Sequence, residues 1–204
     1  MEEKLQFMPT LKDAFAIGAK NILSIVAATI LWVVTIWIPY INVGTTIAMS
    51  MLPVKLSRGE IVNPTYIFDS EYRHIMGEYL ILQVLISSAV MMAMGFLIIP
   101  GIVLGLSWSL ATYLLVDKKM NWALCLSESN RLTMGYKKRI FWLSFVLSLV
   151  FGIAFGLVFA IFGKVPALLV IVLILLYLLA VSVTISLNAV IYRELALTKP
   201  EEAA

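Results

Sequence analysis

Six long apolar runs dominate the chain, and they come in pairs. Each pair follows a mixed polar and apolar segment that ends near a glycine, and a proline separates the two runs of the pair. The glycines are Gly18, Gly77 and Gly135, and the prolines are Pro39, Pro100 and Pro166. Because this order occurs three times, it predicts three tandem repeat units at about residues 4–57, 63–117 and 121–192.

Each apolar run is close to the length of about 20 residues that a helix needs to cross a bilayer. We therefore predict an all-α integral membrane protein, a single membrane domain over residues 1–204, with 193–204 as a short cytoplasmic tail. Its six transmembrane helices form three hairpins, at residues 20–38 and 41–57, 78–98 and 101–117, and 138–162 and 166–192. Each proline fits the first turn of a returning helix, where its missing N–H has no partner to lose. The run 41–57 contains several polar residues and Pro53, so the sequence leaves open whether it crosses fully.

The mixed segments before the hairpins carry helix start signals. Asn63, before Pro64, and Asn121, before Trp122, are typical N-cap residues, and Thr10 begins a loose capping box. Aromatic and charged residues alternate around Tyr72, which is typical of a helix in the headgroup layer. We predict an amphipathic interfacial helix before each hairpin, and ordinary connecting loops are the alternative.

Composition supports a membrane location. Hydrophobic residues make up 62% of the chain, charged residues only 13%, and the mean hydropathy is +1.00. Soluble domains average about 45–50% apolar and about 25% charged residues. The chain has one histidine, His74, and one cysteine, Cys125, so neither a multi-histidine metal site nor an internal disulfide can form. No phosphate-binding loop or catalytic triad is present, and we expect no enzymatic activity, catalytic residue, metal or cofactor.

Charge placement predicts the orientation. Among the fifteen lysines and arginines, Lys164 alone falls in a proline turn, while the others lie at the termini or between the repeat units. Basic residues concentrate in cytoplasmic loops, so we expect both termini in the cytoplasm and the turns near Pro39 and Pro100 outside. The net charge of +3 then indicates contact with anionic lipid, not with nucleic acid.

Three groups of residues are candidates for a site. The basic residues expected to contact lipid headgroups are Arg73, Arg131, Lys137, Lys138 and Arg139; a plain cytoplasmic anchor is the alternative. The residues of a central polar face, spaced four apart in the second run, are Asn42, Thr46 and Ser50. The small residues of a helix-packing face in the fifth run are Ser144, Ser148, Gly152 and Gly156, and a polar path for a substrate is the alternative.

The second and third units also resemble a known group of proteins. The likeness is carried by Ile99-Pro100-Gly101-Ile102, by Ala123-Leu124 with Ser127 and Arg131, and by Met134-Gly135-Tyr136-Lys137 before the run from Ile140. Over about residues 95–150 the chain resembles the YciC-like family of six-helix prokaryotic membrane proteins and the membrane domain of some glycerophosphodiester phosphodiesterases. This resemblance implies a fold and a cytoplasmic membrane location, and it carries no catalytic residue.

Two functions are consistent with these patterns. The first is a non-enzymatic membrane protein that acts through lipids, other membrane proteins or self-association, for instance in envelope homeostasis. The second is a small transporter or channel for a lipid or an uncharged solute. No Asp, Glu, Lys, Arg or His lies in the interior of any predicted span, away from its ends, which disfavours a proton-coupled pump. A polar stripe shared between spans would favour transport, and dry helix contacts would favour a scaffold.

Overall fold

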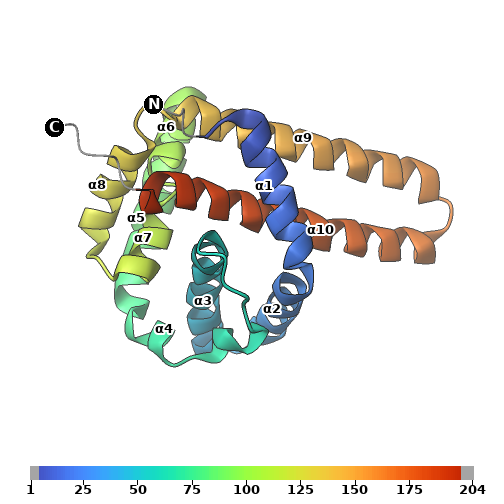
Figure 1. The fold of residues 1–204 in the computed structure, drawn as a ribbon, viewed down its shortest axis with the longest axis horizontal. Coiled ribbons are helices and arrows are strands. Elements are labelled where there is room, and N and C mark those ends of the chain that lie inside the picture. The colour runs from blue at the N-terminus through green and yellow to red at the C-terminus, as the bar shows by residue number, and fades with distance from the viewer. Residues whose placement is uncertain (1–4, 199–204) are drawn as a thin grey trace.

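The computed structural model describes residues 5–198, and every regular element in that part of the chain is helical (Figure 1). Three hairpins follow one another along the chain. They are formed by α2 (Ile22–Thr35) with α3 (Pro39–Ser57), by α5 (Met76–Phe96) with α6 (Ile98–Ser107) and α7 (Ala111–Lys118), and by α9 (Lys137–Phe162) with α10 (Pro166–Tyr192). The predicted all-α architecture is confirmed in the described residues.

A shorter helical segment precedes each hairpin, and one follows the last. These segments are α1 (Phe7–Lys20), η1 (Pro64–Phe68) with α4 (Glu71–His74), α8 (Trp122–Thr133), and the terminal η2 (Arg193–Leu197). Asn63 and Asn121 are N-caps as predicted, because their side chains accept from the N–H groups of Thr65 at 3.2 Å and Ala123 at 2.9 Å. The capping box at Thr10 is wrong: α1 already begins at Phe7, so Thr10 lies inside the helix and is buried.

Four segments are long and apolar enough to cross a membrane: α5, α6 with α7, α9 and α10. A fifth arises only if α1 and α2, which are bent by 71° at their junction, count as one span. Alone, α2 has 14 residues, about 21 Å at 1.5 Å per residue, which is shorter than a hydrocarbon core of about 30 Å. Length and hydropathy therefore support four or five of the six predicted spans.

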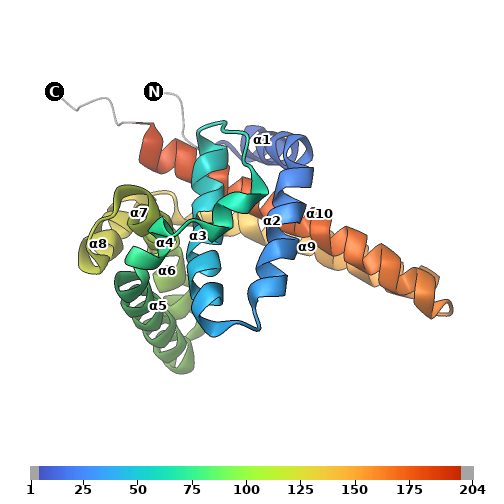
Figure 2. The same ribbon diagram turned by 90° about the horizontal axis from the view of Figure 1, so that it is seen from below.

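The helix α3 lies at the centre of the molecule, although it is the least apolar of the predicted spans. It packs against α2, η1, α4, α7 and α10, and Figure 2 shows it between α2 and the α5–α7 hairpin. Ile47, Ala48 and Leu52 of α3 are completely buried. Because protein surrounds it, α3 tolerates polar side chains that lipid would not.

The second helix of the middle hairpin is broken, which corrects the predicted continuous helix over 101–117. Residues 108–110 separate α6 from α7. Ser129 of α8 satisfies both sides of the break: its hydroxyl donates to the Ser107 carbonyl at 2.8 Å and accepts from the Leu110 N–H at 3.1 Å. Since buried backbone groups need partners, α8 is required to complete this helix.

The hairpins diverge from one another. In Figure 2 the α2–α3 and α5–α6 hairpins point downward, while α9 and α10 project to the right beyond the other helices. The outer parts of α9 and α10 therefore expose large apolar side chains such as Ile153, Leu157 and Leu175. An apolar surface of this kind suits lipid, not water.

Candidate functional site

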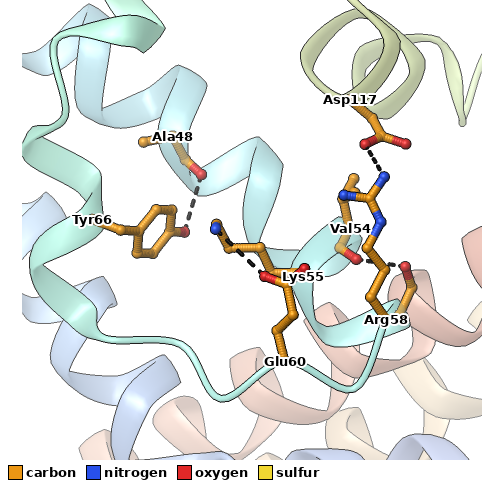
Figure 3. A network of polar contacts seen from close by, with 8 residues as sticks. Ala48, Val54, Lys55, Arg58, Glu60, Tyr66 and Asp117 are labelled. Atoms are coloured by element: carbon orange, nitrogen blue, oxygen red, sulfur yellow. Dashed lines mark hydrogen bonds and ion pairs between the residues drawn. The ribbon is translucent and has the colours of Figure 1, made fainter.

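The ends of α3, α7 and α10, the second helix of each hairpin, meet in one polar cluster. Its members are Arg58, Asp117 and Tyr192, and we call it the three-hairpin cluster. The Arg58 guanidinium donates to one carboxylate oxygen of Asp117 (Figure 3). The Tyr192 hydroxyl donates to the other oxygen at 2.5 Å. The Asp117 side chain is 3% exposed. A buried carboxylate is stable only when paired, so this cluster ties the three hairpins together.

A cavity of about 340 Å³ lies beside this cluster, and we call it the base cavity. Charged side chains of both signs line it, and several of them form ion pairs. Lys119 contacts Glu71 at 2.5 Å, and Lys55 contacts Glu60 at 3.5 Å and lies 5.6 Å from the Tyr66 ring centroid. The Tyr66 hydroxyl donates to the Ala48 carbonyl at 3.0 Å (Figure 3). These pairings make the base cavity a structural joint between α3, α4 and α7.

Two tyrosines of the base cavity stay neutral. Burial, and then the neighbouring Tyr72, raises the pKa of Tyr66 well above its usual value. Burial, followed by the charges of Asp69, Glu71 and Glu60, raises the pKa of Tyr72 to about 12. Both residues therefore act as hydrogen-bonding phenols and not as bases.

A wider groove of about 760 Å³ lies at the start of α9, and we call it the α9 groove. On one side it is lined by Lys138, Arg139, Trp142 and Val146 of α9, and on the other by residues 5–7 at the start of α1. Two of the five predicted headgroup residues, Lys138 and Arg139, thus lie together at a groove that also exposes an indole ring.

The other predicted headgroup residues lie elsewhere. Lys137 donates to the Asn130 side chain at 2.9 Å. Arg131 binds Glu128 through two hydrogen bonds, at 2.8 and 2.7 Å, and these hold the pKa of the Glu128 carboxyl below its usual value. Arg131 is thus held within α8 by its own neighbour.

Arg73 corrects one part of the predicted topology. Its guanidinium carbon lies 6.0 Å from the centroid of the Tyr40 ring, and its side chain packs on Gly44, where a Cβ would come within 3.0 Å of it. The sequence placed Arg73 and the turn near Tyr40 on opposite faces of the membrane. A 6.0 Å contact cannot span a hydrocarbon core of about 30 Å, so the α2–α3 turn and α4 lie at the same depth.

The predicted polar face of α3 borders a cavity of about 260 Å³ between the hairpins, which we call the central cavity. On one side the lining comes from α3, with Thr46, Met49, Ser50 and Pro53. The rest of the lining comes from the neighbouring helices, with Trp32 of α2, Tyr113 of α7, and Ile185 and Asn188 of α10. Asn42 does not line it, but its side chain accepts from the Thr46 hydroxyl at 3.2 Å. The Thr46 hydroxyl in turn accepts from the Trp32 indole at 2.9 Å.

The predicted packing face of α9 does not pack against any other part of residues 5–198. Ser144, Ser148, Gly152 and Gly156 are all exposed. A Cβ placed on Gly152 or Gly156 would meet no atom within 4 Å. The reason is the divergence of the hairpins, because α9 has α10 as its only long neighbour in the outer half and this face is turned away from it.

Sequence reasoning missed the three-hairpin cluster. A signal for part of it exists, since Arg58 and Asp117 are 59 residues apart, the same interval that separates Gly18 from Gly77. Both residues thus end the second helix of their repeat unit. No comparable signal marks Tyr192, because the third hairpin is longer.

The described residues contain no group of three or more His, Cys, Asp or Glu side chains that could hold a metal ion. The resemblance to six-helix prokaryotic membrane proteins stays a prediction. Comparison with protein-family models, with curated proteins and with solved structures finds no match for this chain.

Proposed function

We propose that this chain is a non-enzymatic, multi-pass protein of a prokaryotic cytoplasmic membrane that binds an anionic phospholipid headgroup in the α9 groove. The observation that carries the proposal is the pairing of Lys138 and Arg139 with Trp142 in one groove at the start of a long apolar helix. Cations attract the phosphate, and an indole one turn further along the helix sits at the boundary of headgroups and acyl chains.

The size and surroundings of the groove support a lipid occupant. Its volume of about 760 Å³ lies within the range of ligand sites, about 300–1,000 Å³. Beyond Trp142, the helix exposes Phe145 and Leu149, over which an acyl chain can lie. The groove therefore offers a cationic end and an apolar end in the order that a phospholipid requires.

The membrane arrangement that fits this proposal has four crossing segments: α5, α6–α7, α9 and α10. The α2–α3 hairpin begins and ends on the cytoplasmic side and does not reach the outer face, which agrees with the short α2 and with the contact of Arg73 with Tyr40. Both termini and the α9 groove then face the cytoplasm, where anionic lipid and basic residues meet. In this arrangement the six predicted membrane helices become four spans and one hairpin that does not cross.

A lipid-binding measurement on the purified full chain tests the proposal. Nanodiscs with and without phosphatidylglycerol are compared, and lipid retained by the protein is quantified by native mass spectrometry. For Lys138→Glu, we expect retention of phosphatidylglycerol to fall at least about fivefold, since one lysine near an anionic surface contributes about 1 kcal/mol.

Lys20→Glu is the matched control, because it makes the same charge change on α1 at the end far from the groove. It should retain phosphatidylglycerol like the unmodified chain. Equal losses in both variants would show that only net charge matters, and an unchanged Lys138→Glu would remove the α9 groove as the lipid site.

A further inference from the structure

The central cavity has unsatisfied hydrogen-bonding capacity that the lipid-binding proposal does not use. Within residues 5–198, neither the Asn188 amide nor the Tyr113 hydroxyl has a hydrogen-bond partner, although both line the cavity. No buried side-chain polar atom of the described residues is unsatisfied. These two groups are therefore accessible from the cavity, where they can bond to a molecule inside it.

The opposite wall adds acceptors. Pro53 has no N–H, so the Met49 carbonyl of the preceding turn lacks its usual intrahelical donor. The Ser50 hydroxyl donates to the Thr46 carbonyl at 3.3 Å and keeps its lone pairs for another donor. Donors on α7 and α10 thus face acceptors on α3 across the cavity.

Charge and size restrict what this cavity can hold. Among the described residues that line it, none is charged. An ion inside would meet no counter-charge, which makes its desolvation costly. A volume of about 260 Å³ is below that of most drug-sized sites, and one water occupies about 30 Å³ of liquid. The cavity therefore suits a molecule of several heavy atoms with both donors and acceptors.

The three-hairpin cluster lies about one helical turn beyond the cavity along α7 and α10. Asp117 and Tyr192 each follow a cavity residue, Tyr113 and Asn188, by one helical turn, and Arg58 ends α3 shortly after Pro53. The rings of Tyr113 and Tyr192 also contact each other edge to face, with centroids 6.1 Å apart. Charged groups on that side are thereby engaged with one another and kept out of the cavity.

We propose that the central cavity is a binding site for a small uncharged polyol or amide, held between Asn188 and Tyr113 on one side and Ser50 and the Met49 carbonyl on the other. The site uses residues of all three hairpins, so it exists only in the assembled bundle. It is separate from the α9 groove, and either proposal can fail without the other.

Ligand-observed saturation-transfer NMR on the full chain in phosphatidylcholine nanodiscs tests this site. The probes are glycerol and N-methylacetamide, with zwitterionic glycine for comparison. We expect transfer to both neutral probes and none to glycine. Tyr113→Phe keeps the ring and removes the hydroxyl, and its affinity for the neutral probes should fall about fivefold, the effect of one lost hydrogen bond.

Asn188→Leu is the second variant, and it should abolish transfer, because an apolar side chain of similar size replaces the amide. Thr184→Val, one turn earlier on α10 and exposed, is the control and should bind like the unmodified chain. Thermal unfolding confirms that each variant is folded. Unchanged transfer in folded Tyr113→Phe and Asn188→Leu, or transfer to glycine equal to that of the neutral probes, would overturn the proposal.

Discussion

At the scale of single residues, Asp117 connects all three hairpins through its two carboxylate oxygens. Asp117 belongs to the second hairpin. Its carboxylate accepts hydrogen bonds from Arg58 of the first hairpin and from Tyr192 of the third. Exposed ion pairs contribute little to stability, and the Arg58 side chain is itself 39% exposed. The Asp117 carboxylate, however, is buried and cannot lose its partners without being left unsatisfied. Stability of the bundle therefore depends more on this carboxylate than on any surface charge.

Asp117→Ala tests this dependence. The substitution removes both acceptors and leaves the Tyr192 hydroxyl without its partner, so we expect the free energy of unfolding to fall by about 2–3 kcal/mol. Denaturation in mixed detergent micelles measures it. Glu71→Ala is the control, because Glu71 and Lys119 form an exposed pair. Its free energy of unfolding should fall by less than about 1 kcal/mol. Similar losses in the two variants would mean that the cluster does not join the hairpins.

At the scale of elements, the break between α6 and α7 shows how one helix can depend on another. Residues 108–110 leave backbone groups that α6 and α7 cannot satisfy by themselves. Ser129 satisfies two of them, and the Thr133 hydroxyl also reaches the Ser107 carbonyl at 3.3 Å. Cys125, Ser129 and Thr133, spaced four apart on α8, are all completely buried, so this short helix is part of the core and not a surface element.

Ser129→Ala should therefore destabilise the middle hairpin. It leaves the buried Leu110 N–H without an acceptor, and we expect a loss of about 1–3 kcal/mol in the free energy of unfolding. Ser127→Ala removes the same hydroxyl from an exposed position of the same helix and should change stability by less than about 0.5 kcal/mol. Hydrogen exchange at Leu110 provides a local readout: it should accelerate in Ser129→Ala alone. Unchanged exchange there would show that the break is satisfied in another way.

Most elements could be predicted from the sequence, because apolar runs, prolines and N-cap residues act locally. The prolines at the start of α3 and α10, and the N-caps Asn63 and Asn121, are examples. The break at residues 108–110 could not be predicted, since no glycine or proline marks it and its stabilising partner lies about twenty residues later. The central cavity was only partly predictable: the spacing of Thr46 and Ser50 indicates a shared face, but their partners Tyr113 and Asn188 depend on how the hairpins pack.

At the scale of the whole molecule, the depth of the α2–α3 turn decides the membrane arrangement. Charge placement alone put this turn outside the cell together with the other two turns. The contact of Arg73 with Tyr40 instead holds it at the level of α4. Sequence rules for orientation count the charges along the chain. They contain no information about tertiary contacts, such as the one that brings Arg73 and Tyr40, 33 positions apart, to the same depth in the membrane.

Cysteine labelling from outside intact cells tests this arrangement. Ile99→Cys and Lys164→Cys, at exposed tips of the second and third hairpins, should react with a membrane-impermeant maleimide, and Trp37→Cys at the 88% exposed α2–α3 turn should not. The native Cys125 gives no background, because it is completely buried and burial, then Glu78, raises the pKa of its thiol to about 11. Lys118→Cys should react only after permeabilisation. Equal labelling of Trp37→Cys and Lys164→Cys would instead support the predicted topology of six spans in three hairpins.

The packing of α1 on α10 also affects how the protein is made. The Ser182 hydroxyl donates to the Gly18 carbonyl at 3.0 Å, a contact between residues 164 positions apart, and Arg193 pairs with Asp13 at 2.6 Å. A ribosome adds about 5–20 residues per second, so about 10–30 s pass between the synthesis of α1 and that of its partner α10. During that interval the buried side of α1 has no partner, so the insertion machinery or the lipid surface must cover it. Synthesis of the last helix is therefore the step that completes the first one.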